Sequence, residues 1–142
     1  MYLALKKTHA KDATKLQKII SNLIKWRLCS SYSHSGLVIG DTLYHSSYIN
    51  HGLRCEKFNI DEASGWDLFD LGEERDEKVL SLFKELEGTP YDLIGLLTFI
   101  LPFKADFKEL YCFEWCGLAL GLNITTRVTP EDLLLHISKN KL

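Results

Sequence analysis

The chain has 142 residues, of which 46% are hydrophobic, with 17 Lys and Arg against 19 Asp and Glu. A chain of this length buries roughly two thirds of the surface that it exposes when unfolded, so it can form a core without disulfides or metals. The formal net charge of -2 argues against a nucleic-acid coat or a polybasic membrane anchor, and the apolar content argues against disorder. We expect a single domain over residues 1–142.

The N-terminal segment has no apolar run followed by a small-residue cleavage site, so it does not resemble a signal peptide. The longest apolar stretch, residues 93–103, contains Gly95 and Pro102 and is shorter than the ~20 residues of a membrane span. We therefore expect a cytoplasmic protein with no membrane span. The four cysteines are then expected to be thiols: Cys29, Cys55, Cys112 and Cys116.

The first half of the chain is predicted to be rich in strands. Apolar residues at three- and four-residue intervals predict one amphipathic helix over residues 12–26, starting near Asp12 or Thr14. Short apolar or alternating runs predict strands at residues 2–5, 36–39, 43–47, 52–60 and 66–71. The glycine-containing turn at residues 40–42 joins two of these strands as a hairpin.

The second half is predicted to be helical. Apolar periodicity and helix breakers indicate helices over residues 73–87, 91–100 and 110–122. A last helix begins after Thr129, the expected N-cap, with Pro130 at its first position. Strands followed by helices favour an α+β fold, in which a small antiparallel sheet packs against helices, over alternating β-α units.

Two residues far apart in the sequence have the chemistry that thiol catalysis requires. His34 lies where a polar loop leads into a strand, and Cys112 lies in the first turn of a predicted helix. Free N–H groups and the helix dipole favour a thiolate at that position. Cys116 lies one turn deeper and is expected to be a core residue. The alternative is that both thiols belong to a buried helical stripe and are inert.

An imidazole can take the proton of the thiol, after which the thiolate attacks a carbonyl carbon and a backbone N–H at the helix start binds the oxyanion. A third polar group on the neighbouring strand is expected to orient His34. His45 and Ser46 are both candidates, with His45 preferred, because a register change of one residue exchanges them. Tyr32 is a further candidate for the site, as a substrate-binding residue.

Four motifs in order carry a family resemblance: HSGLVIGD from His34, GLR from Gly52, GTPYDLIG from Gly88 and YCFEW from Tyr111. This order resembles the circularly permuted papain-like superfamily related to NlpC-type cell-wall peptidases, in which the histidine precedes the cysteine. The chain is most similar to YiiX-like bacterial members and to small phage and prophage proteins. The resemblance covers nearly the whole chain.

The resemblance implies a permuted papain-like fold with Cys112 as nucleophile, His34 as base and the third polar residue at His45 or Ser46. Phe113 departs from the serine usual in those relatives, and its ring is expected beside the nucleophile, where it would shape the substrate pocket. A more distant branch resembles lecithin retinol acyltransferase. Its helix motif does not match the run around Cys112, which makes acyl transfer from lipid the less favoured activity.

The function expected is that of a cysteine hydrolase, a peptidase or amidase without cofactor or metal, that cleaves an amide or ester bond in a peptide or acyl-containing substrate. The alternatives are an inactive binding or structural module, with a phage or bacterial partner protein and a place in a virion or a host cytoplasm, and a lipid acyltransferase. A zinc site could also be considered for His45, His51 and Cys55, with Cys29 elsewhere in the chain. The spacing of these residues fits no common pattern of zinc ligands.

Overall fold

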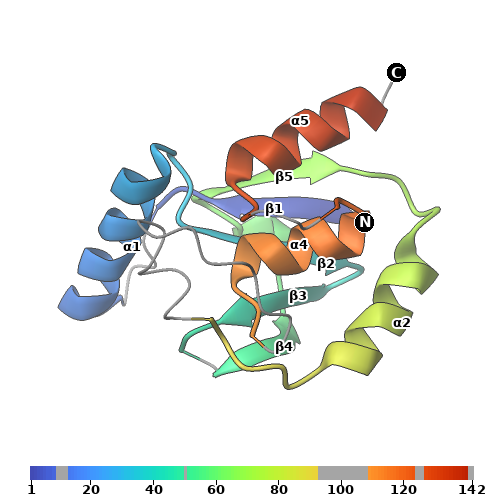
Figure 1. Ribbon diagram of the computed structural model, residues 1–142, viewed down its shortest axis with the longest axis horizontal. Helices are drawn as coiled ribbons and strands as arrows, with labels where there is room; N and C mark the ends of the chain where they lie inside the picture. Colours follow the sequence, from blue (N-terminus) through green and yellow to red (C-terminus); the bar gives the residue numbers. More distant parts are fainter. Residues whose placement is uncertain (9–12, 50, 93–108, 124–126, 141–142) are drawn as a thin grey trace.

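The structure, a computed structural model, describes residues 1–8, 13–49, 51–92, 109–123 and 127–140. Within these residues a five-stranded antiparallel sheet has the order β4-β3-β2-β1-β5 (Figure 1). The strands are β1 (Tyr2–Lys6), β2 (His34–Ile39), β3 (Thr42–Ser47), β4 (Gly52–Lys57) and β5 (Trp66–Asp70). The helices are α1 (Lys15–Leu28), η1 (Ile60–Glu62, a 3-10 turn), α2 (Asp76–Leu86), α4 (Cys112–Leu120) and α5 (Pro130–Asn140).

This arrangement confirms the α+β class and the antiparallel sheet. The predicted strand over residues 52–60 is too long, because β4 ends at Lys57. Asn59 explains this end, since its side chain accepts a hydrogen bond from the backbone N–H of Asp61 (3.1 Å) and so starts η1. The helix expected over residues 91–100 lies outside the described residues except for positions 91 and 92, which are not helical.

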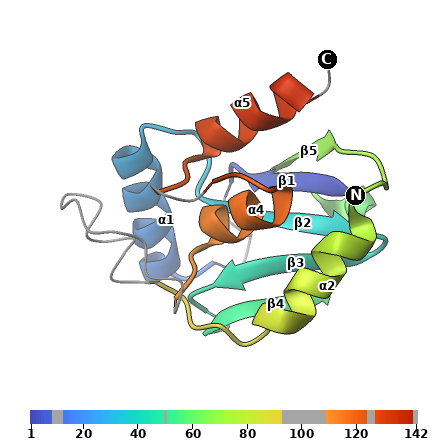
Figure 2. The same cartoon turned by 45° about the vertical axis from the view of Figure 1, so that its right-hand side comes forward.

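α1 has well-defined ends. The Thr14 hydroxyl accepts a hydrogen bond from the backbone N–H of Gln17 (3.2 Å), and the Gln17 side chain accepts one from the backbone N–H of Thr14 (2.8 Å). Cys29 ends the helix in the left-handed region, with φ of 48°. In two views α1 and α2 lie at opposite ends of the sheet (Figures 1 and 2).

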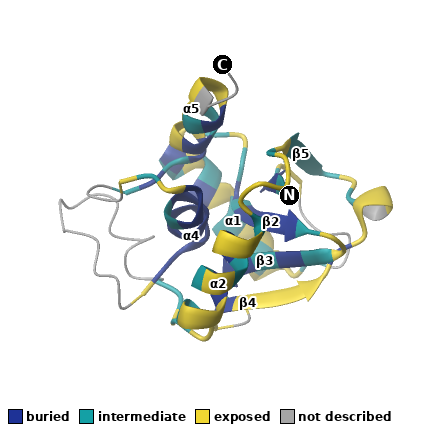
Figure 3. Ribbon diagram, turned by 90° about the vertical axis from the view of Figure 1, so that its right-hand side faces the viewer, coloured by how far each residue is buried: buried dark blue, intermediate teal, exposed yellow. Residues whose placement is uncertain are grey.

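α4 is the central helix of the fold. It is apolar on nearly every side, lies over β2 and β3, and is dark blue along its length in Figure 3, which marks buried residues. Trp115 is fully buried, and its indole N–H donates to the carbonyl oxygen of Tyr44 (2.9 Å). This bond connects α4 to β3, and the packing of the Phe83 ring against Trp115 connects α2 to α4.

Each face of the sheet has its own apolar cluster. Side chains such as Leu5 and Leu37 pack with α4 in the larger cluster. Ala4, Val38 and Leu43 pack with Phe58 in a smaller cluster on the other face, under the connection from β4 to β5. Because side chains alternate along a strand, residues next to each other on β2 face different chemical surroundings.

Candidate functional site

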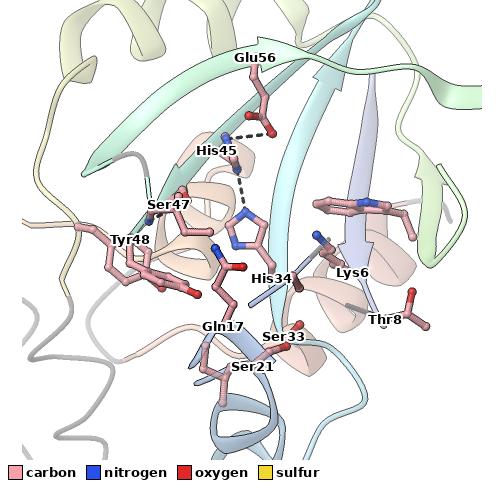
Figure 4. A pocket seen from close by; sticks show the side chains of 15 residues that line it. Lys6, Thr8, Gln17, Ser21, Ser33, His34, His45, Ser47, Tyr48 and Glu56 are labelled. Atoms are coloured by element: carbon pink, nitrogen blue, oxygen red, sulfur yellow. Dashed lines mark hydrogen bonds and ion pairs between the residues drawn. The ribbon is translucent and has the colours of Figure 1, made fainter. Parts of the chain in front are cut away.

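The side chains of His34 and His45 meet on the face of the sheet away from α4. In the register of β2 and β3, Leu37 is opposite Tyr44, which puts Gly36 opposite His45. A side chain built on Gly36 would lie 3.1 Å from the Cβ of His45, so His34, two positions before Gly36, shares the same face. Nε2 of His34 lies 2.7 Å from Nδ1 of His45 (Figure 4).

Glu56 adds a carboxylate to this pair. It lies on edge strand β4 opposite Leu43, and its Oε1 is 3.5 Å from Nε2 of His45, an ion-pair distance. A carboxylate at this position favours a proton on Nε2 of His45. Neutral His45 then accepts a hydrogen bond at Nδ1 from Nε2–H of His34. The unprotonated ring nitrogen of His34 is therefore its Nδ1.

Both rings are neutral near pH 7. Burial lowers the pKa of His34 well below its ordinary value of 6.5, and repulsion from a protonated His45 and from the Lys6 ammonium acts in the same direction. Burial also lowers the pKa of His45, against the opposing effect of the Glu56 carboxylate. His34 is consequently available as a proton acceptor over the whole neutral range.

The histidine pair opens into a cavity of about 290 Å³. The Trp66 ring forms one wall, with its centroid 6.0 Å from that of His34, and the Lys6 ammonium lies 5.3 Å from the Trp66 centroid. Gln17 of α1 and Tyr91 also line the cavity. Figure 4 shows the imidazole of His34 at its centre, with polar side chains on several sides. The cavity offers hydrogen-bond donors and acceptors to a polar ligand.

Cys112 is the first residue of α4, as the sequence predicts for the nucleophile. Its thiol lies against the backbone and hydroxyl of Ser35, the N–H of Phe113 and the hydroxyl of Tyr91. The sequence favours a thiolate at Cys112, but in the structure the buried side chain is a neutral thiol. Cys112 is only 1% exposed, and burial raises its pKa to about 11, which outweighs the favourable N–H groups.

The structure brings His34 to His45 but does not bring it to Cys112. The thiol faces Ser35, the next residue along β2, and alternation turns the two side chains to opposite faces. Within the described residues no hydrogen bond or charge interaction joins His34 to Cys112. Tyr91 is the link between the two groups, because it contacts the thiol and also lines the cavity.

The start of α4 is held at this place by backbone contacts with earlier motifs. The N–H of Leu53 donates to the carbonyl of Thr89 (2.9 Å), and the N–H of Leu110 donates to the carbonyl of Pro90 (3.0 Å). Gly52, with φ of 136°, permits this approach, since a Cβ there would lie 2.2 Å from the Thr89 oxygen. These contacts fix the segment that follows Gly88 and so place Tyr91 beside the thiol of Cys112.

Three other predicted site residues lie outside the cavity. Ser46 faces α4, where its buried hydroxyl donates to the carbonyl of Leu110 (2.5 Å), so it holds the start of the helix and does not orient His34. The Tyr32 hydroxyl donates to Asp67 (2.7 Å). Phe113 is fully buried in the core beside the Tyr111 ring. Neither Tyr32 nor Phe113 lines the cavity around His34.

Two residues of the site, Glu56 and Tyr91, are not among the residues predicted from the sequence. Glu56 falls in the strand predicted over residues 52–60, and the alternation of that strand together with the hairpin register places it beside His45. Tyr91 falls at the start of the helix predicted over residues 91–100, and no local signal links it to Cys112. Among the described residues, no three His, Cys, Asp or Glu side chains form a metal-binding group, so His45, His51 and Cys55 do not form one together.

The comparisons with known proteins leave the family open. No family model matches the chain, and no curated protein matches it. In the part of the chain that the structure describes, no helix has both the length and the apolar character needed to cross a bilayer.

Proposed function

We propose that the protein is a thiol hydrolase of the permuted papain-like type that cleaves an amide or ester bond. Cys112 is the nucleophile, His34 is the general base, and His45 with Glu56 orients His34. A peptide-like acyl group is the substrate class that the resemblance favours. The cavity around His34 is the place where the proposal puts the reacting carbonyl.

One observation carries the proposal: the Glu56 carboxylate lies at ion-pair distance from His45, which is hydrogen-bonded to His34, and the neutral His34 ring lines a cavity. A histidine that has an orienting partner and lines a cavity meets the geometric requirements of a general base. The cavity and the thiol at the start of α4 share one neighbour, Tyr91. Catalysis requires the sulfur to reach the cavity, and Tyr91 lies on that path.

In the proposed reaction, Nδ1 of His34 takes the proton from Sγ of Cys112 as the sulfur forms a bond to the carbonyl carbon. The carbonyl π electrons move to oxygen, where the N–H of Phe113 donates to the oxyanion. When the tetrahedral intermediate collapses, the bond to the leaving group breaks and the His34 imidazolium protonates that group. A water molecule, deprotonated by His34, then cleaves the thioester and regenerates the thiol.

A non-catalytic binding module is the second candidate, and the state of Cys112 favours it. The thiol is buried, its pKa is raised to about 11, and no hydrogen bond or charge interaction joins it to His34. Phe113 is packed in the core, so a bulky ring at this position supports the fold. A papain-like scaffold that has lost its activity would keep the cavity as a ligand site.

Acyl-enzyme formation distinguishes the two candidates. We would incubate the protein with p-nitrophenyl acetate and with an alanine p-nitroanilide, follow nitrophenol or nitroaniline release, and locate any acetyl or alanyl group by intact and peptide mass. The hydrolase proposal predicts acylation of Cys112 and turnover that Cys112→Ala abolishes. Cys116→Ala is the matched control, because Cys116 is an equally buried thiol one turn deeper in α4.

Turnover that survives Cys112→Ala would overturn the assignment of the nucleophile. Absence of both turnover and acylation, in a protein whose melting curve shows that it is folded, would support the binding module.

A further inference from the structure

α1 presents an apolar face to solvent. Leu16, Ile19, Leu23 and Trp26 recur at three- and four-residue intervals and form one line along the helix, which we call the α1 stripe. Their exposed fractions are 65%, 64%, 44% and 74%. Single exposed apolar residues are common on protein surfaces, but four in one line on one helix mark an interaction site.

The orientation of α1 is fixed by its other side. Ile24 and Leu28 are buried in the main core, and Gln17 lines the cavity. The capping box at Thr14 fixes the start of the helix. The stripe therefore cannot turn inward without loss of these contacts. Figures 1 and 2 both show α1 on the outside of the molecule, beyond the ends of the strands.

The charge of α1 differs from that of the whole chain. The helix has four basic residues, Lys15, Lys18, Lys25 and Arg27, and no acidic residue, although the chain has a formal net charge of -2. Lys15 and Lys18 are exposed beside the stripe. An apolar line that contains a tryptophan and is flanked by lysines is the pattern of helices that lie in a membrane interface.

We propose that α1 docks the protein on the surface of an anionic membrane, with the α1 stripe among the upper acyl chains and Lys15 and Lys18 at the phosphates. The lysines complement a negatively charged surface. They oppose a symmetric contact with a second copy, because that contact would bring the basic helices of both copies together. At 14 residues, α1 lies on the bilayer and does not cross it.

This docking is independent of the thiol chemistry, because none of the four stripe residues lines the cavity. Its failure would leave the hydrolase proposal intact, and failure of the hydrolase proposal would leave the docking intact.

The test is binding of the full chain to large unilamellar vesicles of phosphatidylcholine, alone or with about one third phosphatidylglycerol, measured by co-sedimentation. We expect binding at least about tenfold stronger to the anionic vesicles, weakened by high salt. Trp26 provides a second readout. It is 74% exposed, whereas Trp66 is half-buried in the cavity wall and Trp115 is fully buried, so docking shifts the emission to shorter wavelength mainly through Trp26.

Two variants and one control test the assignment of the surface. Ile19→Asn with Leu23→Asn should lower vesicle binding about tenfold or more, and Lys15→Glu with Lys18→Glu should remove the preference for anionic lipid. Leu135→Asn is the control, since Leu135 is 54% exposed on another helix, α5, and its loss should leave binding unchanged.

Three results would overturn the proposal: no binding of the wild-type chain to anionic vesicles, equal effects of the α1 and Leu135 variants, or self-association that the stripe variant abolishes. The last result would assign the stripe to a dimer contact. If the double asparagine variant does not fold, the lysine variant still tests the proposal, because both lysines are exposed and their replacement leaves the core intact.

Discussion

The two faces of the sheet at the start of β2 differ in chemistry although they share one strand. On the α4 face, Ser35 lies against Cys112 and Cys116 in a sealed environment. On the other face, His34 pairs with His45 beside an open cavity. Burial raises the pKa of both thiols and lowers the pKa of both imidazoles, so all four groups are neutral near pH 7.

This difference shows how one residue of strand alternation divides a potential catalytic pair. A thiolate and an imidazolium stabilise each other only when they are close together. With Ser35 facing the sulfur and His34 turned away, neither group ionises the other in this state. We therefore expect substitutions on the sealed α4 face to lower mainly stability, and substitutions on the open cavity face to lower mainly activity.

The largest expected effect concerns stability on the α4 face. Trp115→Ala removes a fully buried indole and its bond to Tyr44, which we expect to lower the free energy of unfolding by about 3–5 kcal/mol. Trp66→Ala, on the cavity face, removes a half-buried ring and should cost about 1–2 kcal/mol. Denaturant unfolding measures both. Equal losses would show that the two faces do not differ in packing as described.

The next effect concerns activity on the open face. If the thiol hydrolase proposal holds, His34→Ala should lower kcat/KM by roughly 10²–10⁴-fold, because it removes the base. Glu56→Gln should have a smaller effect, since Glu56 acts through His45 and half of its side chain is exposed. His51→Asn, an exposed residue in the left-handed region, is the control.

The pH profile tests the same assignment. Because burial lowers the pKa of His34, the base is active above that pKa and loses activity as the pH falls through it. The acid limb of kcat/KM should therefore lie below the ordinary histidine value of 6.5. An acid limb above 6.5 would contradict the neutral state assigned to His34.

The smallest effect concerns Glu114 on α4. Burial raises its pKa to about 7 from an ordinary value of 4.5. The folded state therefore holds this proton more tightly than the unfolded state. The stability it provides is full below pH 4.5 and is lost as the pH rises through about 7. Glu114→Gln should remove this dependence, so the variant gains on the order of 1–3 kcal/mol over wild type between pH 4 and pH 8.

Unfolding of wild type and variant in parallel isolates the contribution of Glu114, because the histidines contribute equally to both curves. Parallel curves for the two proteins would show that folding does not raise the pKa of Glu114.

Much of the fold could be predicted from local patterns. Apolar periodicity predicted the helices that became α1 and α2, and the turn at Gly40 predicted the hairpin that brings β2 beside β3. That hairpin also limited the candidate partners of His34 to His45 and Ser46, and the observed register places His45 beside it. These features depend on residues close together in the sequence, so periodicity and turn chemistry were sufficient.

The relation between His34 and Cys112 could not be predicted in the same way. α4 starts 78 residues after His34 (112 minus 34), and the relation depends on which face of β2 this helix covers. The apolar pattern of β2 allows either face. Tyr32 has the same difficulty, because its partner Asp67 lies on a distant strand. The position of Phe113 depends on how α4 is turned, and α4 is apolar on nearly every side.

The proposed hydrolase requires Cys112 and His34 to act as one site, although their side chains lie on opposite faces of the sheet. The rate of alkylation of Cys112 by iodoacetamide near neutral pH, followed by intact mass with the exposed Cys29 and Cys55 replaced by Ser, tests this requirement. We expect Cys112 to react faster than Cys116, and His34→Ala to slow the reaction of Cys112 about tenfold or more. A Cys112 that is as unreactive as Cys116, or that reacts at the same rate without His34, would contradict it.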